Sequence, residues 1–391
     1  MAAFSTTGPS EGRLRRLRSI QEVDRDAWDA LVGDDDPFVE HDFLSLLEES
    51  GSVGPGTGWL PQHLTLSEGE RLVAALPLYL KGHSYGEYIF DWAWAGAASR
   101  LGIPYYPKLL SMVPLTPATG RRLLIADGVD PSWATGRLLD GCFELADSTS
   151  ASSLHLHFVS EEERELLRQD GRLMPRTTLQ YHWQNAGYRD FDDYLDRFRS
   201  PSRKQVRRER RRVAESGLEI RLVSGDALTM DDWRAIGGFY SSTCQMKLSH
   251  AYLTPRFFEL AHRRIHRHAR IVLALDGATR VAGSLCFHKG QHLYGRYWGS
   301  ADDFEMLHFE LCYYRPLEYA IAEGVTRFEA GAQGSHKLDR GLMPSPVHSF
   351  HWVRDEVLGP AVGEYLGHEA REIEARIVEL SARGPFKRSG S

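Results

Sequence analysis

The chain has 391 residues, of which 42% are hydrophobic and 26% are charged, and its formal net charge is −6. This length and composition predict a globular protein of two domains, or three, each able to bury its own core. No apolar run approaches the ~18 residues that span a membrane. The four cysteines are far apart and contain no CxxC pair, which excludes a disulfide framework and a cysteine metal site. The N-terminus lacks the apolar segment of a signal peptide, so we expect a disordered tail over residues 1–18 and a cytoplasmic protein.

Residues 19–50 are predicted to form a short strand and two amphipathic helices, with Trp28 and Phe43 among the buried side chains. Two hairpins follow along the chain, each made of two strands joined by a tight turn and continued by a third apolar strand. In both halves a helix and a further strand come next, so each half reads as a β-β-β-α-β unit. The segments are 63–67, 71–81, 88–95, about 130–147 and 153–159 in the first half, and 270–276, 280–289, 292–299, about 305–323 and 325–330 in the second.

Both second strands end in Lys-Gly, at Lys81 and at Lys289, and these two lysines are 208 residues apart. We interpret the pattern as a weak internal duplication, with chance similarity of two hairpins as the alternative. Between the halves, residues 199–212 contain eight Arg or Lys and one Glu, a local charge of +7 that leaves −13 for the rest of the chain. The expected fold is α+β, with two tandem units and a basic helix between them. The expected segments are a first unit over 19–180, a connecting basic helical region over 181–217, a second unit over 218–358, and a C-terminal helix and tail over 359–391.

Val206 and Val213 give the basic helix only a thin apolar seam, so most of its surface must face solvent or a polyanion. Four of its cations lie one turn apart and are candidates to bind nucleic acid or another phosphate-rich ligand. A solvated charged face and attachment to a membrane surface are the alternatives. The candidate phosphate-binding residues are Lys204, Arg207, Arg208 and Arg211.

The stretch from 293 to 340 gathers many polar residues that are suited to catalysis. A predicted strand there is followed by a Gly-rich segment that ends in His336 and Lys337, where an α/β layer commonly carries its site. His308, Glu310 and His336 are general-base candidates, because each can accept a proton from a reacting group. An ordinary αβ unit with a polar loop is the alternative interpretation.

A loop rich in Pro and Tyr in the first half, over 102–125, indicates a rigid binding surface, with a packed crossover loop as the alternative. No GxSxG, HExxH or GxxxxGK[ST] motif is present, so the chemistry of those motifs is excluded. His155 and His157 would share one face of a strand, but no Cys or acidic partner is near in sequence, so we expect no metal. The candidate substrate-binding residues from both halves are Lys337, Gln333, Arg296, Tyr297, Trp298, Tyr314, Tyr105, Tyr106 and Lys108.

In its repeated unit and basic helix the chain resembles the Fem-type tandem acyltransferases of the GNAT superfamily. More closely, it is similar over about residues 19–355 to a bacterial family of Fem-like N-acyltransferases linked to peptidoglycan biosynthesis. The segments that carry this similarity are YYPKL, VPLTPATGRRLL, HWQNAGYRDFDDYL, RKQVRRER, YGRYWG, LHFELCYY and FEAGAQGSHK. The resemblance implies two tandem GNAT-like units and no tightly bound cofactor. It also implies transfer of an aminoacyl or acyl group to the amine of a small molecule or peptide.

Typical GNAT enzymes hold the pyrophosphate of acetyl-CoA with a Gly-rich loop after the fourth strand. The matching place here reads WGSADDFEMLHFE, and Asp302, Asp303 and Glu305 are acidic where a pyrophosphate needs bare backbone amides. This departure favours aminoacyl-tRNA over acyl-CoA as the co-substrate. An acetyl-CoA-dependent GNAT N-acetyltransferase is one alternative, and a non-catalytic binding protein for nucleic acid or a cell-wall precursor is another.

Both donors lead to one reaction, in which an amine attacks an activated carbonyl. The enzyme must position the two groups, remove a proton from the amine and stabilise the developing oxyanion. We expect Glu310 or His308 to take the proton, and Lys337 or a backbone amide near Gly334 to stabilise the oxyanion. The concentration of titratable residues in this stretch favours an enzyme over a binding module.

Overall fold

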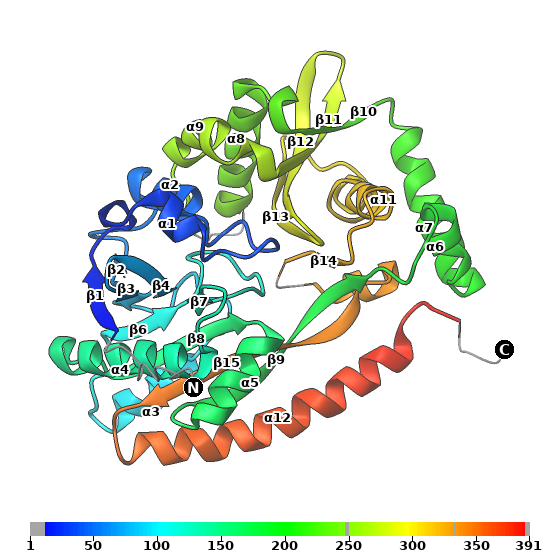
Figure 1. Cartoon of the computed structure of the whole chain (residues 1–391). Coiled ribbons are helices and arrows are strands. Elements are labelled where there is room, and N and C mark those ends of the chain that lie inside the picture. The colour runs from blue at the N-terminus through cyan, green and yellow to red at the C-terminus, as the bar shows by residue number, and fades with distance from the viewer. Residues whose placement is uncertain (1–11, 247–249, 332–333, 388–391) are drawn as a thin grey trace, which may run out of the picture.

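The computed structural model describes residues 12–246, 250–331 and 334–387. Its strands form one large mixed sheet and one small antiparallel sheet (Figure 1). In sheet order, the eleven strands of the large sheet are β10 (Glu219–Ser224), β11 (Ala269–Asp276), β12 (Thr279–Lys289), β13 (His292–Ser300), β14 (Arg327–Glu329), β9 (Met174–Gln184), β15 (Met343–Val353), β8 (Ser153–Val159), β6 (Lys108–Ser111), β5 (Tyr79–Lys81) and β2 (Trp59–Pro61). The strands of the small sheet are β1 (Arg13–Leu17), β3 (His63–Glu68), β4 (Arg71–Leu76) and β7 (Leu124–Ile125).

The longest helix, α12 (Leu358–Arg383), lies along β9 and β15 in the middle of the large sheet (Figure 1). On the second half, α8 (Met230–Met246) packs on β12 and β13, and on the first half α4 (Pro131–Thr149) packs on β3 and β4. The other α-helices are α1 (Arg25–Asp29), α2 (His41–Glu49), α3 (Trp92–Arg100), α5 (Glu161–Asp170), α6 (Phe191–Asp196), α7 (Ser200–Ala214), α9 (Pro255–Arg264), α10 (Leu307–Phe309) and α11 (Arg315–Ala322). A π-helical turn, η4 (Glu310–Tyr314), joins α10 to α11, and the 3-10 segments are η1 (Ile20–Glu22), η2 (Gly225–Ala227), η3 (His266–His268) and η5 (Ser335–Arg340).

The two halves exchange strands in the middle of the large sheet. Strand β9, from the first half, lies between β14 and β15 of the second, and β15 in turn lies between β9 and β8. In this register His182 on β9 pairs with Glu329, and His351 on β15 pairs with His155. The predicted boundary between residues 180 and 181 falls inside β9, so it does not separate two structural units.

The predicted third strand of the first half, over 88–95, is wrong. Those residues instead lead into α3, whose alanine-rich sequence has high helix propensity. The third strand is β6, which pairs antiparallel with β5 and parallel with β8, as β13 pairs with β12 and β14. The two halves therefore repeat the same pattern of strand pairing, with β6 in place of the strand expected over 88–95. The disordered tail predicted over 1–18 is also wrong in part, because Arg13–Leu17 form β1 and pair with β3, while residues 1–11 lie outside the described residues.

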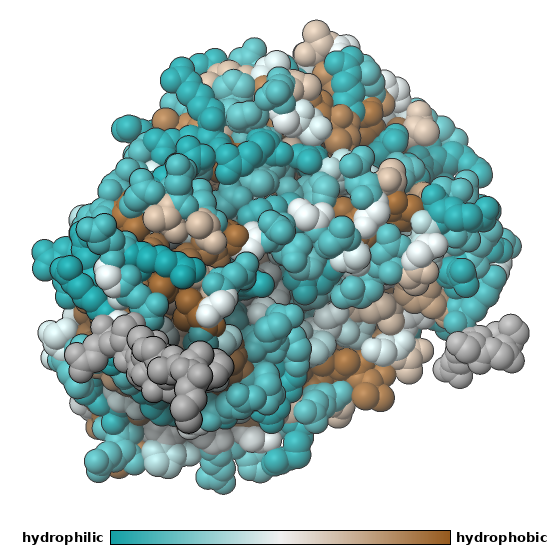
Figure 2. Space-filling model, in the orientation of Figure 1, coloured by the Kyte–Doolittle hydropathy of each residue, from teal (hydrophilic) through white to brown (hydrophobic). Residues whose placement is uncertain are grey.

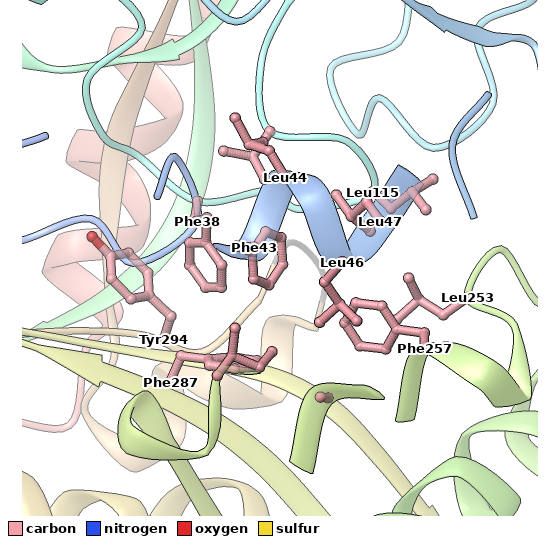
Figure 3. Packing of buried hydrophobic residues seen from close by; sticks show 14 of the residues in the cluster. Phe38, Phe43, Leu44, Leu46, Leu47, Leu115, Leu253, Phe257, Phe287 and Tyr294 are labelled. Atoms are coloured by element: carbon pink, nitrogen blue, oxygen red, sulfur yellow. The ribbon is translucent and has the colours of Figure 1, made fainter. Parts of the chain in front are cut away.

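The largest hydrophobic cluster joins the two halves (Figure 3). Phe43 on α2 packs edge-on against Phe257 on α9 and Phe287 on β12, with ring centroids 6.2 and 6.0 Å apart. Burial of each such side chain stabilises the fold by roughly 1.5–3 kcal/mol. Because the side chains of this cluster come from both halves, the halves share one core. The face of the molecule in Figure 2 is mostly hydrophilic, including the edge where Figure 1 places α7. Within the described ranges, no helix is long and apolar enough to cross a membrane.

Candidate functional site

The parallel strands β13 and β14 diverge, and candidate site residues gather where they separate. The strands pair at only three positions, from His292 with Arg327 to Tyr294 with Glu329. Beyond Tyr294, β13 continues to Ser300 alongside β12 without a partner strand on its other side among the described residues. Such an opening leaves backbone groups and polar side chains free to meet a ligand in the middle of a sheet.

A β-bulge distorts β13 just beyond this point. Cys286 pairs with Gly295 and Leu285 with Tyr297, so Arg296 is the extra residue. Bulges re-aim side chains and occur next to active sites. Here the guanidinium of Arg296 donates to the Leu115 carbonyl of the first half, at 2.5 Å, and to the Tyr297 hydroxyl, at 3.3 Å. The predicted substrate-binding residues Arg296 and Tyr297 therefore lie at the junction of the two halves.

The helix that follows β13 opens into the π-turn η4, which brings aromatic and imidazole groups together. π-Turns inside α-helices occur frequently at functional sites. The hydroxyl of Tyr313 hydrogen-bonds Nε2 of His336, at 2.9 Å. The rings of His308 and His336 have centroids 5.7 Å apart, and Trp298 packs edge-on against His308 at 5.2 Å. Three predicted residues, His308, His336 and Trp298, are thus brought into one cluster.

Lys337 is buried beside this cluster, with only 1% of its surface exposed. Its ammonium donates to the Gly331 carbonyl at 2.6 Å, and burial lowers its pKa to about 8. Burial, together with the charges of Arg340 and Lys337, also lowers the pKa of His336 below its ordinary value. At neutral pH the site therefore presents a neutral imidazole next to a buried cation, which suits proton acceptance and anion stabilisation respectively.

Gly334 has a backbone conformation and a close contact with the His336 ring that both favour glycine at this position. Its φ is +116°, in the region that L side chains rarely adopt. A Cβ at this position would lie 2.5 Å from Cε1 of His336. The glycine thus lets the imidazole lie directly against the chain. The predicted substrate-binding residue Gln333 lies outside the described residues.

Glu310 faces a different neighbourhood from the imidazole cluster. Its buried carboxylate is 3.0 Å from Arg210 of α7 and 3.0 Å from Arg315 of α11. The predicted substrate-binding residue Tyr314 is also buried, and its hydroxyl donates to Glu209 of α7. Both arginines are ion-paired with this carboxylate, so Glu310 belongs to a salt-bridge network that is separate from the imidazole cluster.

From the sequence, Tyr313 and Arg340 belong to the polar stretch from 293 to 340 but have no assigned role, and Glu209 is not singled out as a site residue. Arg340 donates to the His336 carbonyl at 2.7 Å and to Glu209 at 2.8 Å, and its guanidinium lies 3.5 Å from the Phe309 ring centroid. Two signals point to these residues. Tyr313 follows Phe309 by four positions on one helix, and Glu209 is the single acid in the basic run.

The predicted phosphate-binding cations lie on the exposed surface of α7. Lys204, Arg208 and Arg211 form no ion pair with any residue of the described ranges, whereas Arg207 pairs with exposed Asp192 at 3.3 Å. On one side of this helix a groove of about 630 Å³ separates it from η4 and β10. The charged residues that line the groove are Asp192, Arg207, Arg210, Arg211, Glu310, Arg315 and Glu318.

In the first half, Lys108 and Tyr105 belong to a buried network. The Lys108 ammonium is fully buried and donates to Ser84 and Glu87, both at 2.8 Å, and to Asp91. Burial lowers the pKa of Lys108, but the nearby carboxylates outweigh this effect and the pKa is raised. The Tyr105 hydroxyl donates to Asp91 at 2.6 Å. Both side chains are buried within this network, and their contact with a substrate stays a prediction.

Tyr106 lies at the edge of the same network. Its hydroxyl hydrogen-bonds Ser84 at 2.8 Å, and its side chain is only half-buried. Lys81 is 3.8 Å from Glu87 of this network and lies over the Trp59 ring at 3.6 Å, and burial lowers the pKa of this lysine to about 7. The two halves thus contribute separate polar clusters, and the predicted residues divide between them.

The arrangement of two β-β-β-α-β units around one continuous sheet defines a tandem GNAT-like α+β protein. The chain belongs to the FemAB_like family, described by its role in peptidoglycan biosynthesis/recognition, whose profile matches residues 19–388. This confirms the family expected from the sequence.

Solved structures with a similar fold share little sequence with the chain. FemX is 13% identical, with a TM-score of 0.53 over 90% of this chain and 100% of FemX. The C-terminal domain of a putative lysylphosphatidylglycerol synthetase from Agrobacterium fabrum is 10% identical, with a TM-score of 0.54 over 88% of this chain and 96% of that domain. A conserved protein of unknown function from Bacteroides thetaiotaomicron is 10% identical, with a TM-score of 0.53 over 88% and 100% of the chains. No curated protein sequence matches the chain.

Proposed function

We propose that the protein is a Fem-like transferase that moves an aminoacyl group from aminoacyl-tRNA to an acceptor amine. The observation that carries the proposal is the cluster of His336, Tyr313, His308 and Lys337 where β13 and β14 diverge. Membership of the FemAB_like family supports it, because that family is described by peptidoglycan biosynthesis/recognition. The fold shared with FemX agrees with this choice.

In the reaction the amine nitrogen attacks the carbonyl carbon of the aminoacyl ester, and a C–N bond replaces the C–O bond to the ribose. His336 accepts the proton of the attacking amine, because its lowered pKa leaves the imidazole neutral at pH 7. Tyr313 positions this imidazole through its hydroxyl. The same proton then passes to the departing ribose oxygen, so that the ribose hydroxyl is restored and charge balances.

Lys337 stabilises the negative charge that develops on the carbonyl oxygen. With a pKa of about 8 it is mostly protonated at pH 7, and its burial makes a charge–charge interaction stronger than in water. His308 lies between Trp298 and His336, where it supports the imidazole edge-on. We assign the general base to His336 rather than to Glu310, because Glu310 is ion-paired with two arginines outside the imidazole cluster.

The exposed cations of α7 bind the phosphates of the tRNA in this proposal. Lys204, Arg208 and Arg211 are exposed and have no carboxylate partner among the described residues, so binding a polyanion breaks no internal ion pair. The acidic residues Asp302 and Asp303 are exposed at the place where a GNAT enzyme binds pyrophosphate. Their charge disfavours acyl-CoA as the donor.

The direct test is incubation with labelled aminoacyl-tRNA and, separately, with acetyl-CoA, each against a panel of amines, with product masses measured. We expect aminoacylated products from the tRNA donor that are lost in His336→Ala and kept in Tyr319→Phe. Tyr319 is a matched control because its hydroxyl binds Arg270 and His288 instead of the cluster. Products from acetyl-CoA alone would replace the tRNA donor, and tRNA binding without any product would make the chain a binding protein.

A further inference from the structure

Three histidines converge outside the candidate site, on one face of the large sheet. His155 and His157 are two residues apart on β8 and therefore share a face, and the register places His351 of β15 opposite His155. One nitrogen from each ring lies within 4.8 Å of the corresponding nitrogens of the other two rings. At most 1% of each side chain is exposed. Strand exchange between the halves thus brings together three imidazoles that the sequence separates by up to 196 residues.

The two facing histidines are held in the same way on both strands. Nε2 of His155 is 2.8 Å from the Ser153 hydroxyl, and Nε2 of His351 is 2.8 Å from the Ser349 hydroxyl. Each serine lies two residues before its histidine, so a Ser-x-His pattern appears once on each strand. The Nδ1 atoms of both rings point at each other, 2.7 Å apart. Outer hydrogen bonds of this kind fix the ring orientation of histidines that bind metals.

His157 has a nitrogen without a partner. Its Nδ1 is buried and makes no hydrogen bond, whereas the ring is hydrogen-bonded to the backbone of Glu87. A shared proton can join His155 to His351, but it leaves this third nitrogen unsatisfied, at a cost of about 1–3 kcal/mol. A cation placed among the three rings would give all the inward nitrogens a partner.

We propose that His155, His157 and His351 bind a divalent transition metal, best matched by Zn²⁺, which joins β8 of the first half to β15 of the second. Neutral imidazoles are typical ligands of Zn²⁺, and three of them leave a fourth position for water. Two nitrogen ligands, each at about 2.0–2.1 Å from a tetrahedral Zn²⁺, lie about 3.4 Å from each other. The Nδ1 atoms of His155 and His351 are 2.7 Å apart, so they must move apart by roughly 0.7 Å when the ion binds. No metal was expected from His155 and His157 alone, because the third ligand, His351, is brought to them only by the order of strands in the sheet.

The surroundings fit a structural ion and not a catalytic one. Trp94 of α3 covers the site, with its ring 4.9 Å from His351 and 6.1 Å from His155. Asp91 lies 3.9 Å from Nε2 of His155, but this carboxylate is paired with Lys108, and the charges of Lys108 and Arg176 also act on the histidines, so the imidazole nitrogens themselves must supply the binding energy. Full burial means that the metal binds while the chain folds.

The test uses the untagged full-length protein, refolded from guanidinium chloride with Zn²⁺ or Co²⁺ and then passed through buffer with EDTA. We expect about one metal ion per chain and, for Co²⁺, the visible absorption of a tetrahedral site. His157→Ala and His351→Ala should each lose more than nine-tenths of the bound metal. His182→Ala, which removes a buried histidine from β9, should keep it.

Two results would overturn the proposal. One is a wild-type protein that refolds, as circular dichroism shows, with less than about a tenth of an equivalent of metal and no Co²⁺ absorption. The other is metal content that persists in both histidine variants, which would locate the ion elsewhere. If a variant fails to fold, the wild-type Co²⁺ absorption still decides whether the protein holds a tetrahedral metal site, and its absence overturns the proposal.

Discussion

Glu209 and Arg340 form a buried ion pair, 2.8 Å long, that connects α7 to the segment carrying His336. The same arginine donates to the His336 carbonyl, and Tyr314 donates to the same glutamate. Removing one partner of such a pair leaves a buried charge uncompensated. The orientation of the basic helix and the position of the imidazole are therefore set together.

His336→Ala should lower kcat by about 10²–10⁴, the usual contribution of a general base. Tyr313→Phe should lower kcat by about tenfold, because it removes one hydrogen bond that positions the imidazole. Tyr319→Phe, on the same helix but directed to Arg270, should leave kcat unchanged. Steady-state rates with a labelled aminoacyl donor measure all three. Equal losses in Tyr313→Phe and Tyr319→Phe would point to a general effect on the helix.

Lys337→Met should abolish turnover and yet stabilise the protein at pH 7. Burial lowers the pKa of this lysine from 10.5 to about 8, which corresponds to about 3 kcal/mol, and the hydrogen bond to Gly331 returns about 1 kcal/mol. Between these pKa values the unfolded lysine holds a proton that the folded lysine has lost, so wild-type stability rises with pH over that window. The advantage of the methionine variant should therefore shrink toward pH 10. Urea unfolding at several pH values measures it, and a variant less stable than wild type at pH 7 contradicts the argument.

The pH profile of kcat/KM should be bell-shaped. Activity should fall on the acid side as His336 takes up a proton, at a pH below the ordinary histidine pKa, because burial disfavours the charged imidazole. On the alkaline side it should fall near pH 8, where Lys337 loses its charge. A profile that lacks the alkaline limb would remove Lys337 from oxyanion stabilisation.

Glu310→Gln should lower the free energy of unfolding by only about 1–2 kcal/mol, because Arg210 and Arg315 lose this buried carboxylate but keep their ion pairs with Glu318. We expect its kcat to fall less than tenfold, since the carboxylate takes no proton in the proposed reaction. Denaturant unfolding and steady-state rates separate the two effects. A loss of 10³ in kcat with unchanged stability would restore Glu310 as the general base.

The triple variant Lys204→Ser, Arg208→Ser, Arg211→Ser should bind tRNA more weakly and with less salt dependence. Each phosphate contact contributes about 0.7–0.9 to the slope of log K against log salt, so three lost contacts should lower it by about 2–3. A charge-matched control replaces Arg371, Arg376 and Arg383 of α12 with serine. If the control weakens binding equally, only overall charge matters and the α7 surface is not the binding site.

Gly334→Ala should destabilise the fold by about 1–3 kcal/mol and lower kcat, because its φ of +116° is strained for alanine and its Cβ meets the His336 ring. Gly367→Ala is the control, since this exposed helical glycine of α12 has open space around it and should be stabilised by about 0.5–1 kcal/mol. Thermal unfolding compares the two.

Local patterns carried much of the fold prediction. The hairpins that contain Gly69 and Gly277, the basic helix and the helix after β13 all appear where periodicity and turn residues indicated them. The strand expected over 88–95 failed because its apolar run has no period that separates strand from helix. The helix propensity of the alanines decided the outcome, without a side-chain cap from Asp91.

Contacts between residues that are far apart in the sequence could not be predicted, because they depend on how the elements pack in the fold. His308 and His336 were candidates from residue type, but the ion pair of Glu209 with Arg340 depends on α7 docking against η5, which no sequence spacing encodes. The meeting of His351 with His155 likewise depends on the order of strands in the sheet. Burial of Lys108 was missed because its three polar partners come from a loop and a helix start elsewhere in the chain.

Because β9 and β15 each complete the sheet of the other half, neither half can be produced as an autonomous domain. A chain cut between residues 185 and 199 would leave β14 and β8 as bare edges, ready to pair with other molecules and aggregate. Two separately expressed fragments could regain the native sheet only by assembling with each other. Such complementation would offer a split-protein reporter whose reassembly reads out contact between the two halves.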